Sequence, residues 1–237
     1  MTTTETAGSS HWGKIDGVSI DFPMVVDEMH QLTLTYTVPL AAAQALLPGE
    51  AFEVMEVAPG SAMLIVALVD YVKNPWGDYN EINLGLLSHP VGQPERSGAF
   101  VWRMPVDQEF TKQAGNEVLG LPKTVEELAY EYTDDTVTVH LARDGAEAMT
   151  VRFPRQLGDD PATVTEAVTW SYIEGKPSEL PLVIEVGSAM IDPALIEVSL
   201  GAGPIADELR SLGLPKPPDL AMYGEGLSGT FQLPRPA

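Results

Sequence analysis

Short segments with a two-residue period, separated by turns, are the feature of this chain that most limits its possible folds. Residues 31–38 alternate polar and apolar side chains from Leu32 to Val38. This period predicts a strand with one buried face. Residues 61–72 are almost continuously apolar, which predicts a strand buried on both faces. We therefore expect the chain to build its core mainly from strands.

Further strands are expected along the whole chain, at residues 52–57, 79–87, 98–105, 125–133, 135–142, 147–153, 166–173, 181–189, 195–200 and 226–233. Only short helices are expected, at residues 40–47, 108–118 and 204–211. The second helix is predicted to begin with Asp107 as its N-cap and to end at Gly120. Many short strands with few helices predict an α+β, mostly-β fold, built as an antiparallel barrel or sandwich.

The chain has 237 residues and no low-complexity linker, so we expect a single domain over residues 15–237. Residues 1–14 are expected to form a disordered tail, because the first ten are small and polar with Glu5 as their only charge. These residues lack the basic start and apolar centre of a signal peptide. No apolar run approaches the ~20 residues of a membrane span. The sequence therefore predicts a cytoplasmic protein without a membrane partner.

The formal net charge is −21, from 34 acidic and 13 basic side chains. This charge repels phosphate backbones and anionic membrane surfaces, so nucleic acid is not an expected partner. The chain has no cysteine, which excludes disulfides, thiolate catalysis and cysteine-ligated zinc. No two histidines have metal-ligand spacing, and no Gly-x-Gly-x-x-Gly motif precedes a helix. We expect neither a metal nor a cofactor.

Lys123 stands out because it ends the apolar stretch Ala-Gly-Asn-Glu-Val-Leu-Gly-Leu-Pro-Lys, residues 114–123. Apolar walls remove the hydration of an ammonium ion and so favour the neutral amine, which is a nucleophile suited to a carbonyl carbon. Most lysines, however, lie in solvent, and Leu-Gly-Leu-Pro-Lys recurs at 212–216 in what looks like an exposed connector. Lys123 is thus a candidate Schiff-base lysine, with a solvated surface residue as the alternative.

Further side chains are candidates for a pocket around Lys123. Glu81 is either a solvated carboxylate at a strand end or an acid or base beside the pocket. Arg103 lies among apolar neighbours, where it either pairs with an acid or holds a substrate carboxylate. Trp76 and Trp102 flank these segments and are either core residues or walls of the pocket.

Several short motifs occur together in a fixed order, namely Leu47-Pro48, Tyr79-x-Glu81, Gly115-x-Glu117, Pro122-Lys123 and Leu233-Pro234-Arg235. In these motifs the chain resembles the acetoacetate decarboxylase superfamily over most of its length, from about residue 20. The resemblance implies a cone-like β-barrel with few helices, usually assembled into homo-oligomers. It also implies that Lys123 is a Schiff-base lysine, with Glu81 and Glu117 as pocket carboxylates and Tyr79 beside the substrate.

The chain departs from that family at positions that matter for chemistry. The family's decarboxylases carry a second lysine directly after the first, which favours the free amine, whereas this chain has Thr124. Asn116 replaces the basic residue usual between the glycine and glutamate of the motif, and no arginine falls at residues 27–30. The positive charge available to a substrate carboxylate is therefore reduced, unless Arg103 supplies it.

Three functions remain open from the sequence. The first is a Schiff-base lyase that uses Lys123 on a keto acid or ketide-like carbonyl substrate for aldol-type, dehydration or cyclisation chemistry. The second is a true β-keto acid decarboxylase that works without the second lysine. The third is a noncatalytic barrel that binds a small molecule. In the first two, Glu81 or Glu117 moves protons during imine formation.

Overall fold

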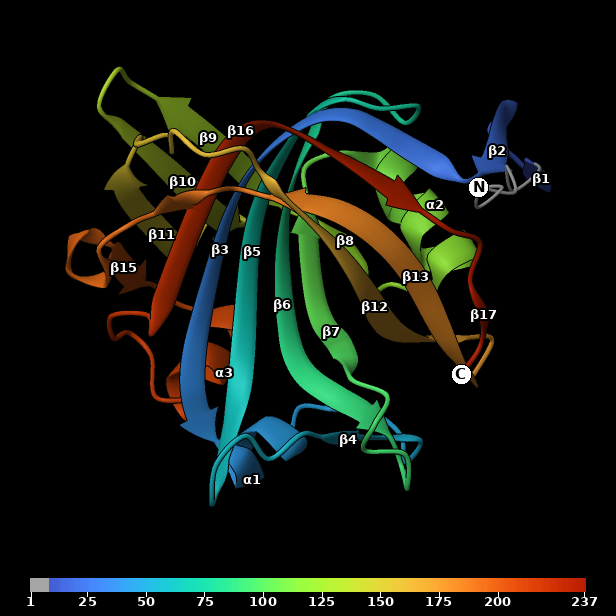
Figure 1. Ribbon diagram of the computed structural model, residues 1–237, viewed down its shortest axis with the longest axis horizontal. Coiled ribbons are helices and arrows are strands. Elements are labelled where there is room, and N and C mark those ends of the chain that lie inside the picture. Colours follow the sequence, from blue (N-terminus) through green and yellow to red (C-terminus); the bar gives the residue numbers. More distant parts are fainter. Residues whose placement is uncertain (1–8) are drawn as a thin grey trace, which may run out of the picture.

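A computed structural model describes residues 9–237, and Figure 1 shows a mostly-β molecule built around a barrel. Seven strands close this barrel in the order β3, β5, β6, β7, β12, β13 and β16. They span Met24–Pro39, Ser61–Lys73, Tyr79–Pro90, Gly98–Val106, Thr163–Ile173, Lys176–Val186 and Leu220–Phe231. The pairs of β16 with β3 and with β13 complete the ring. The mostly-β barrel expected from the sequence is confirmed.

One pair of barrel strands departs from the antiparallel pattern. Strands β7 and β12 run parallel, paired at Ala99 with Thr169 and at Phe100 with Trp170. Parallel neighbours need a long crossover connection, and here residues 107–162 supply it. That crossover contains helix α2 (Glu109–Leu119) and most of a second sheet. The crossover therefore brings α2 and the following residues against the barrel wall.

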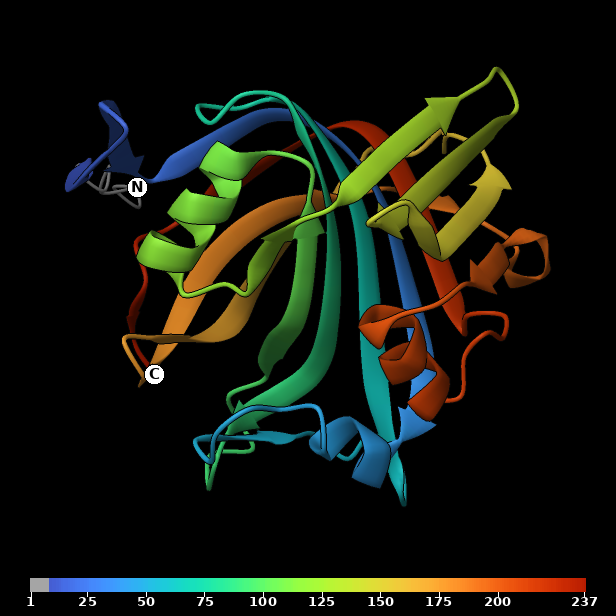
Figure 2. The ribbon, with the colours of Figure 1, turned by 180° about the vertical axis from the view of Figure 1, so that it is seen from behind.

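The second sheet has four strands in the order β15, β11, β10 and β9, which span Glu197–Leu200, Ala146–Pro154, Thr136–Arg143 and Glu127–Tyr132. The remaining short elements are β4 (Phe52–Val54), β8 (Lys123–Val125), β14 (Ala189–Met190), β17 (Arg235–Pro236), α1 (Leu40–Gln44), α3 (Pro204–Ser211) and a 3₁₀ turn at Pro193–Leu195. Figure 2 shows the second sheet and α3 on one side of the barrel and α2 on the other. No helix between residues 9 and 237 has the length and apolarity needed to cross a bilayer.

Strand β5 shows how the barrel wall separates a dry core from a cavity. Leu64, Val66 and Leu68 point outwards into a buried cluster, whereas Ile65 and Ala67 line the barrel interior. The outward residues are at most 3% exposed, and the inward ones are half-buried. The expectation that residues 61–72 are buried on both faces is therefore right for the outer face, whereas on the inner face Val69 and Tyr71 are buried and Ile65 and Ala67 are half-buried. The inner face borders empty space.

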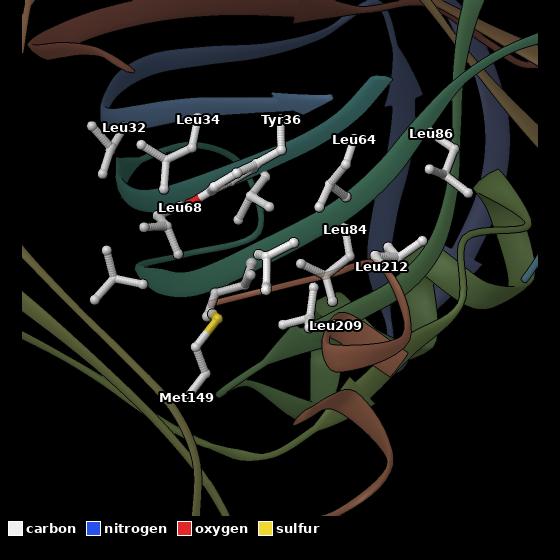
Figure 3. Packing of buried hydrophobic residues seen from close by; sticks show 14 of the residues in the cluster. Leu32, Leu34, Tyr36, Leu64, Leu68, Leu84, Leu86, Met149, Leu209 and Leu212 are labelled. Carbon is white, nitrogen blue, oxygen red and sulfur yellow. The ribbon is translucent and has the colours of Figure 1, made fainter. Parts of the chain in front are cut away.

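The outward cluster fixes the second sheet and α3 to the barrel (Figure 3). Side chains from three barrel strands meet Met149 of β11 and Leu209 and Leu212 at the end of α3. Each fully buried aliphatic side chain contributes about 1.5–3 kcal/mol. This packing makes the barrel wall a rigid support for the residues on its inner face.

The N-cap of helix α2 lies one residue later than predicted. Gln108 caps the helix, because its side chain accepts a hydrogen bond from the Thr111 N–H at 3.1 Å. Asp107 instead accepts hydrogen bonds from the backbone and side chain of Asn80. The predicted end is confirmed, since Gly120 adopts a left-handed conformation with φ of 65°.

The N-terminal segment is more ordered than the sequence suggested. Strand β1 (Ser10–Ile15) pairs with β2 (Val18–Phe22) across a turn at Asp16 and Gly17, both with positive φ. Residues 10–14 were expected in a disordered tail, and an Asp-Gly turn is a hairpin signal that this expectation overlooked. Residues 1–8 of the expected tail lie outside the described residues. The assignment of residues 15–237 to one domain stays a prediction.

Candidate active site

The barrel interior contains a cavity of about 270 Å³. Its walls come from barrel strands, Trp76 and the segment that follows α2, and they are mostly aliphatic. Among the described residues the charged side chains that line it are Lys123 and Glu81. Uncharged polar side chains also face it, and these are Gln31, Thr33, Tyr71, Tyr79, Asn83 and Thr169. A concave, mostly apolar space with a few convergent polar groups is typical of a small-molecule site.

The end of α2 and the start of β8 place Lys123 in this cavity. Lys123 pairs with Met104 of β7 in a parallel ladder. Asn116 holds its backbone from both sides, because its Oδ1 accepts from the Lys123 N–H at 2.9 Å and its Nδ2 donates to the Lys123 carbonyl at 3.2 Å. Asn116, which stands where the family usually has a basic residue, thus fixes the Lys123 backbone through two hydrogen bonds and adds no charge.

The Lys123 amine is buried and contacts a carboxylate, a hydroxyl group and two aromatic rings. Its side chain is 3% exposed, and Nζ lies 2.6 Å from Glu81 Oε2. Nζ also donates to Thr111 Oγ1 at 2.8 Å. The ring centroids of Tyr79 and Trp76 lie 5.0 and 5.9 Å away, within range of a cation–π interaction. A buried charge needs a close partner of opposite sign, and Glu81 is that partner.

Glu81 is held in place by the strands around it. Its Oε1 accepts from Asn83 Nδ2 at 3.0 Å and from the Tyr71 hydroxyl at 3.4 Å. Its Oε2 has no aligned hydrogen bond among the described residues, so its close contact is the Lys123 ammonium. One carboxylate oxygen therefore anchors Glu81, and the other is free to exchange a proton with the amine.

Two stacked phenols complete this end of the cavity. The rings of Tyr71 and Tyr79 lie 4.5 Å apart between their centroids. Burial raises the pKa of both phenols well above the usual value, and the negative charge of Glu81 raises it further. Both phenols therefore stay protonated over the physiological range. Because the Tyr71 hydroxyl donates to Glu81, the Tyr79 hydroxyl is the one available to donate to an oxygen in the cavity.

The structure brings some of the expected site residues together and separates others. Lys123, Glu81, Tyr79 and Trp76 line the cavity, whereas Glu117, Arg103 and Trp102 are not among its lining residues. Glu117 is exposed on α2 and accepts a hydrogen bond from Gln113.

Arg103 and Trp102 face away from the cavity for a backbone reason. Leu84 pairs with Arg103 while Gly85 pairs with Val101, so β7 has one extra residue at Trp102. This β-bulge shifts the alternation of side chains and turns Arg103 outwards. Its guanidinium pairs with Glu208 of α3 at 2.6 Å, and Trp102 Nε1 donates to the same carboxylate. The alternative in which Arg103 pairs with an acid is the one observed.

Sequence reasoning missed three polar residues around the amine, namely Tyr71, Asn83 and Thr111. Thr111 had a signal, because it shares the buried face of α2 with Ala114, Gly115 and Val118. Their spacing is that of one helix face. Tyr71 and Asn83 alternate in phase with cavity-facing residues of β5 and β6, which becomes informative only once the inner face of each strand is known.

The fold and the site define a class of protein: a closed, mostly-β barrel whose cavity holds a buried lysine paired with a glutamate. Residues 9–227 match the acetoacetate decarboxylase family. The chain therefore belongs to the acetoacetate decarboxylase family. No curated protein has a matching sequence.

Solved structures with this fold include acetoacetate decarboxylase from Legionella pneumophila subsp. pneumophila str. Philadelphia 1, with a TM-score of 0.64, 14% identity and coverage of 91% of this chain and 87% of that chain. The enduracididine biosynthesis enzyme MppR complexed with pyruvate has a TM-score of 0.58 at 16% identity and covers 90% of each chain. An acetoacetate decarboxylase-like enzyme from Sphingomonas wittichii RW1 has a TM-score of 0.57 at 19% identity, with 98% and 100% coverage. At such identities the likeness establishes a shared fold.

Proposed function

We propose that this protein is an enzyme that forms a Schiff base between Lys123 and a ketone or aldehyde. The observation that carries the proposal is the buried contact of 2.6 Å between Lys123 Nζ and Glu81 Oε2 at the wall of the barrel cavity. A nucleophile beside a carboxylate that can take its proton is the arrangement that imine formation requires. Membership of the acetoacetate decarboxylase family supports the same role for Lys123.

Imine formation begins with transfer of one proton from the Lys123 ammonium to Glu81. The free amine then attacks the carbonyl carbon, a C–N bond forms, and the carbonyl oxygen takes a proton from the nitrogen to give a carbinolamine. Glu81 returns its proton to the hydroxyl group, which leaves as water, and the product is a protonated imine. Such proton transfers by a positioned side chain contribute about 10²- to 10⁴-fold to a rate.

The tyrosines and Thr111 have supporting roles in this scheme. The Tyr71 hydroxyl donates to Glu81, so the Tyr79 phenol is the one that hydrogen-bonds the substrate oxygen as it gains negative charge. Thr111 accepts a hydrogen bond from Nζ and so directs the amine. The Glu81 carboxylate then stabilises the protonated imine. All of these steps use side chains of this chain alone.

The protonated imine is an electron sink, and an aldol-type, dehydration or cyclisation reaction is our preferred outcome. The MppR structure with the condensation product of pyruvate and imidazole 4-carboxaldehyde has this fold, with a TM-score of 0.58 and 16% identity. That ligand supports carbon–carbon bond formation within such a barrel. The protein is then a lyase, and its homo-oligomeric assembly and cytoplasmic location stay predictions.

Decarboxylation of a β-keto acid is the second candidate, and family membership favours it. A noncatalytic binding barrel is the third, and it predicts that ligand binding survives Lys123→Ala. The two enzymatic candidates share the imine and differ in whether carbon dioxide is released from acetoacetate.

Deuterium exchange tests the proposal without knowledge of the natural substrate. A protonated imine loses an α-proton readily, so the protein in D₂O should label the α-carbon of at least one compound in a panel of small ketones, aldehydes and keto acids. Nuclear magnetic resonance measures this label. Lys123→Ala should reduce the labelling to the protein-free rate. Equal labelling by wild type and Lys123→Ala would refute the imine mechanism.

A further inference from the structure

We propose that the carbonyl substrate is uncharged and carries an apolar chain, and that a neutral side chain rather than a cation at position 31, where Gln31 stands, contributes to this selectivity. The inference rests on the proposed function, because it concerns what Lys123 attacks. It narrows the substrate class from keto acids and ketide-like compounds to the uncharged members of the second group.

The charges around the cavity disfavour an anionic substrate. Lys123 and Glu81 are the charged side chains among the described residues that line it, and they neutralise one another. A protonated imine on Lys123 keeps a single positive charge, which Glu81 again balances. A carboxylate on the substrate would add a negative charge with no cation to pair it, and an unpaired charge in an apolar cavity is strongly disfavoured.

Glu81 itself strengthens this exclusion. It lies 2.6 Å from the nitrogen that becomes part of the imine, so a carboxylate close to the substrate carbonyl would face a like charge at short range. The bulge in β7 removes Arg103, which would otherwise be the next source of positive charge, and Glu208 neutralises it on the outer face. The cavity is thereby selective against anions at both its polar end and its walls.

The walls and the volume define the rest of the substrate. Away from Lys123 the lining is mostly aliphatic, with side chains such as Ile65, Val101, Leu182 and Ile184. The volume of about 270 Å³ lies just below the ~300–1,000 Å³ typical of small-molecule pockets. This space fits a small carbonyl compound with a short hydrocarbon chain.

Gln31 lies where the far part of such a chain would reach. The strand registers place Gln31 beside Val69 and Val69 beside Glu81, in one row across β3, β5 and β6. Two strand spacings separate Gln31 from Glu81, which is about 10 Å along the wall. Gln31 is 8% exposed and lines the cavity. It is thus the polar side chain that marks the distal end of this row.

The amide of Gln31 is only partly used by the protein. Its Nε2 donates to Thr33 Oγ1 at 2.7 Å, and its Oε1 has no hydrogen-bond partner among residues 9–237. A neutral amide accepts or donates a hydrogen bond but brings no charge to balance a carboxylate. Gln31 therefore suits a hydroxyl or a second carbonyl oxygen on an uncharged substrate.

A matched pair of probes tests the inference on the wild-type protein. The probes are 2-heptanone and 6-oxoheptanoate, in which a carboxylate replaces the terminal methyl group. Borohydride reduction traps the imine as a stable secondary amine, and intact mass measures the rate. We expect 2-heptanone to be trapped at least about tenfold faster, which corresponds to about 1.4 kcal/mol. The neutral methyl ester of 6-oxoheptanoate should be trapped at a rate close to that of the ketone.

Substitution of Gln31 tests the assigned residue. Gln31→Arg supplies a cation that cannot itself form an imine, and it should shift the ratio of rates towards 6-oxoheptanoate by about tenfold or more. Gln31→Met, of similar length and without charge, should keep the preference for 2-heptanone. Circular dichroism measures whether each variant is folded. If Gln31→Arg does not fold, the comparison of the probes on the wild-type protein still decides the substrate class.

The outcomes separate this inference from the proposed function. Trapping of 6-oxoheptanoate as fast as 2-heptanone would overturn the inference and leave the Schiff-base mechanism intact. An unchanged ratio in folded Gln31→Arg would overturn the role of Gln31. If none of the probes or the carbonyl panel formed an adduct that depends on Lys123, the proposed function itself would fail.

Discussion

Gly115 lies directly against the side chain of Lys123, so closely that a Cβ added at Gly115 would come within 2.5 Å of Lys123 Cδ and 2.7 Å of Cε. The absence of a side chain at Gly115 therefore leaves the space that the Lys123 side chain occupies against α2. We predict that Gly115→Ala displaces the amine from Glu81 and lowers the trapping rate by about 10- to 100-fold, because misplacement by about 1 Å has effects of this size.

Helix propensity alone predicts the opposite effect, namely a more stable α2 in Gly115→Ala. Alanine favours a helix interior over glycine by about 1 kcal/mol, so Gly115→Ala should lose activity without a matching loss of helical signal. Gln113→Ala on the same helix is the control and should keep the wild-type trapping rate. Wild-type activity in Gly115→Ala would show that the contact does not position Lys123.

Glu81 and Glu117 were both predicted from the sequence as proton carriers, and the structure separates them. Glu81→Gln keeps the shape of the side chain but removes the group that takes the lysine proton. We predict that it slows imine trapping by about 10²-fold or more. Glu117→Gln, at an exposed position of α2, should stay within twofold of wild type. A reversed order of the two effects would assign proton transfer to Glu117.

Alkaline pH should destabilise the protein through the buried phenols. The pKa values of Tyr71 and Tyr79 are raised well above 10.0, mainly by burial. Below pH 10 the phenols stay protonated in both the folded and the unfolded state, so they add no pH dependence to the free energy of unfolding. Above pH 10 the unfolded chain loses them while the folded chain retains them, so the free energy of unfolding falls as pH rises.

Chemical denaturation between pH 9 and pH 11 measures this effect. The double variant Tyr71→Phe/Tyr79→Phe should have a smaller fall in unfolding free energy over the same range, because it has two fewer linked protons. An equal fall in wild type and variant would show that other groups cause the alkaline loss.

Arg103 is predicted to stabilise the fold without contacting the substrate. Its ion pair with Glu208 is partly exposed, with the arginine side chain 40% exposed, and such pairs contribute up to about 1 kcal/mol. Arg103→Ala should therefore lower the unfolding free energy by no more than about 1 kcal/mol and leave trapping of carbonyl compounds unchanged. A selective loss of trapping for carboxylate-bearing compounds would instead support a role in substrate binding.

Local sequence patterns were sufficient for much of this site. The Gly-Leu-Pro segment after an amphipathic helix correctly predicted that Lys123 begins a strand just beyond the end of α2. Period-two alternation correctly predicted the strand at residues 31–38, which lies within β3. Glu81 was correctly placed near the start of a strand. These features depend on neighbouring residues alone, which is why sequence reasoning reached them.

The positions of Arg103 and Glu117 depend on more distant contacts. One extra residue in β7 reverses the facing of Arg103, and the partner strand that defines this bulge is not visible in the local sequence. Glu117 belongs to the family motif, yet the rotation of α2 against β8 directs it to solvent. Tertiary packing decides which residues of a strand face the barrel interior and which face of a helix is exposed to solvent.

The most direct test of the central claim is to locate the reduced adduct by peptide mapping after borohydride treatment with a carbonyl compound. The buried amine of Lys123, held beside Glu81, predicts one adduct, on the peptide that contains Lys123, and none in Lys123→Ala. Adducts distributed equally over Lys14, Lys73 and Lys216, or adduct formation unchanged in Lys123→Ala, would contradict the assignment of Lys123 as the Schiff-base residue.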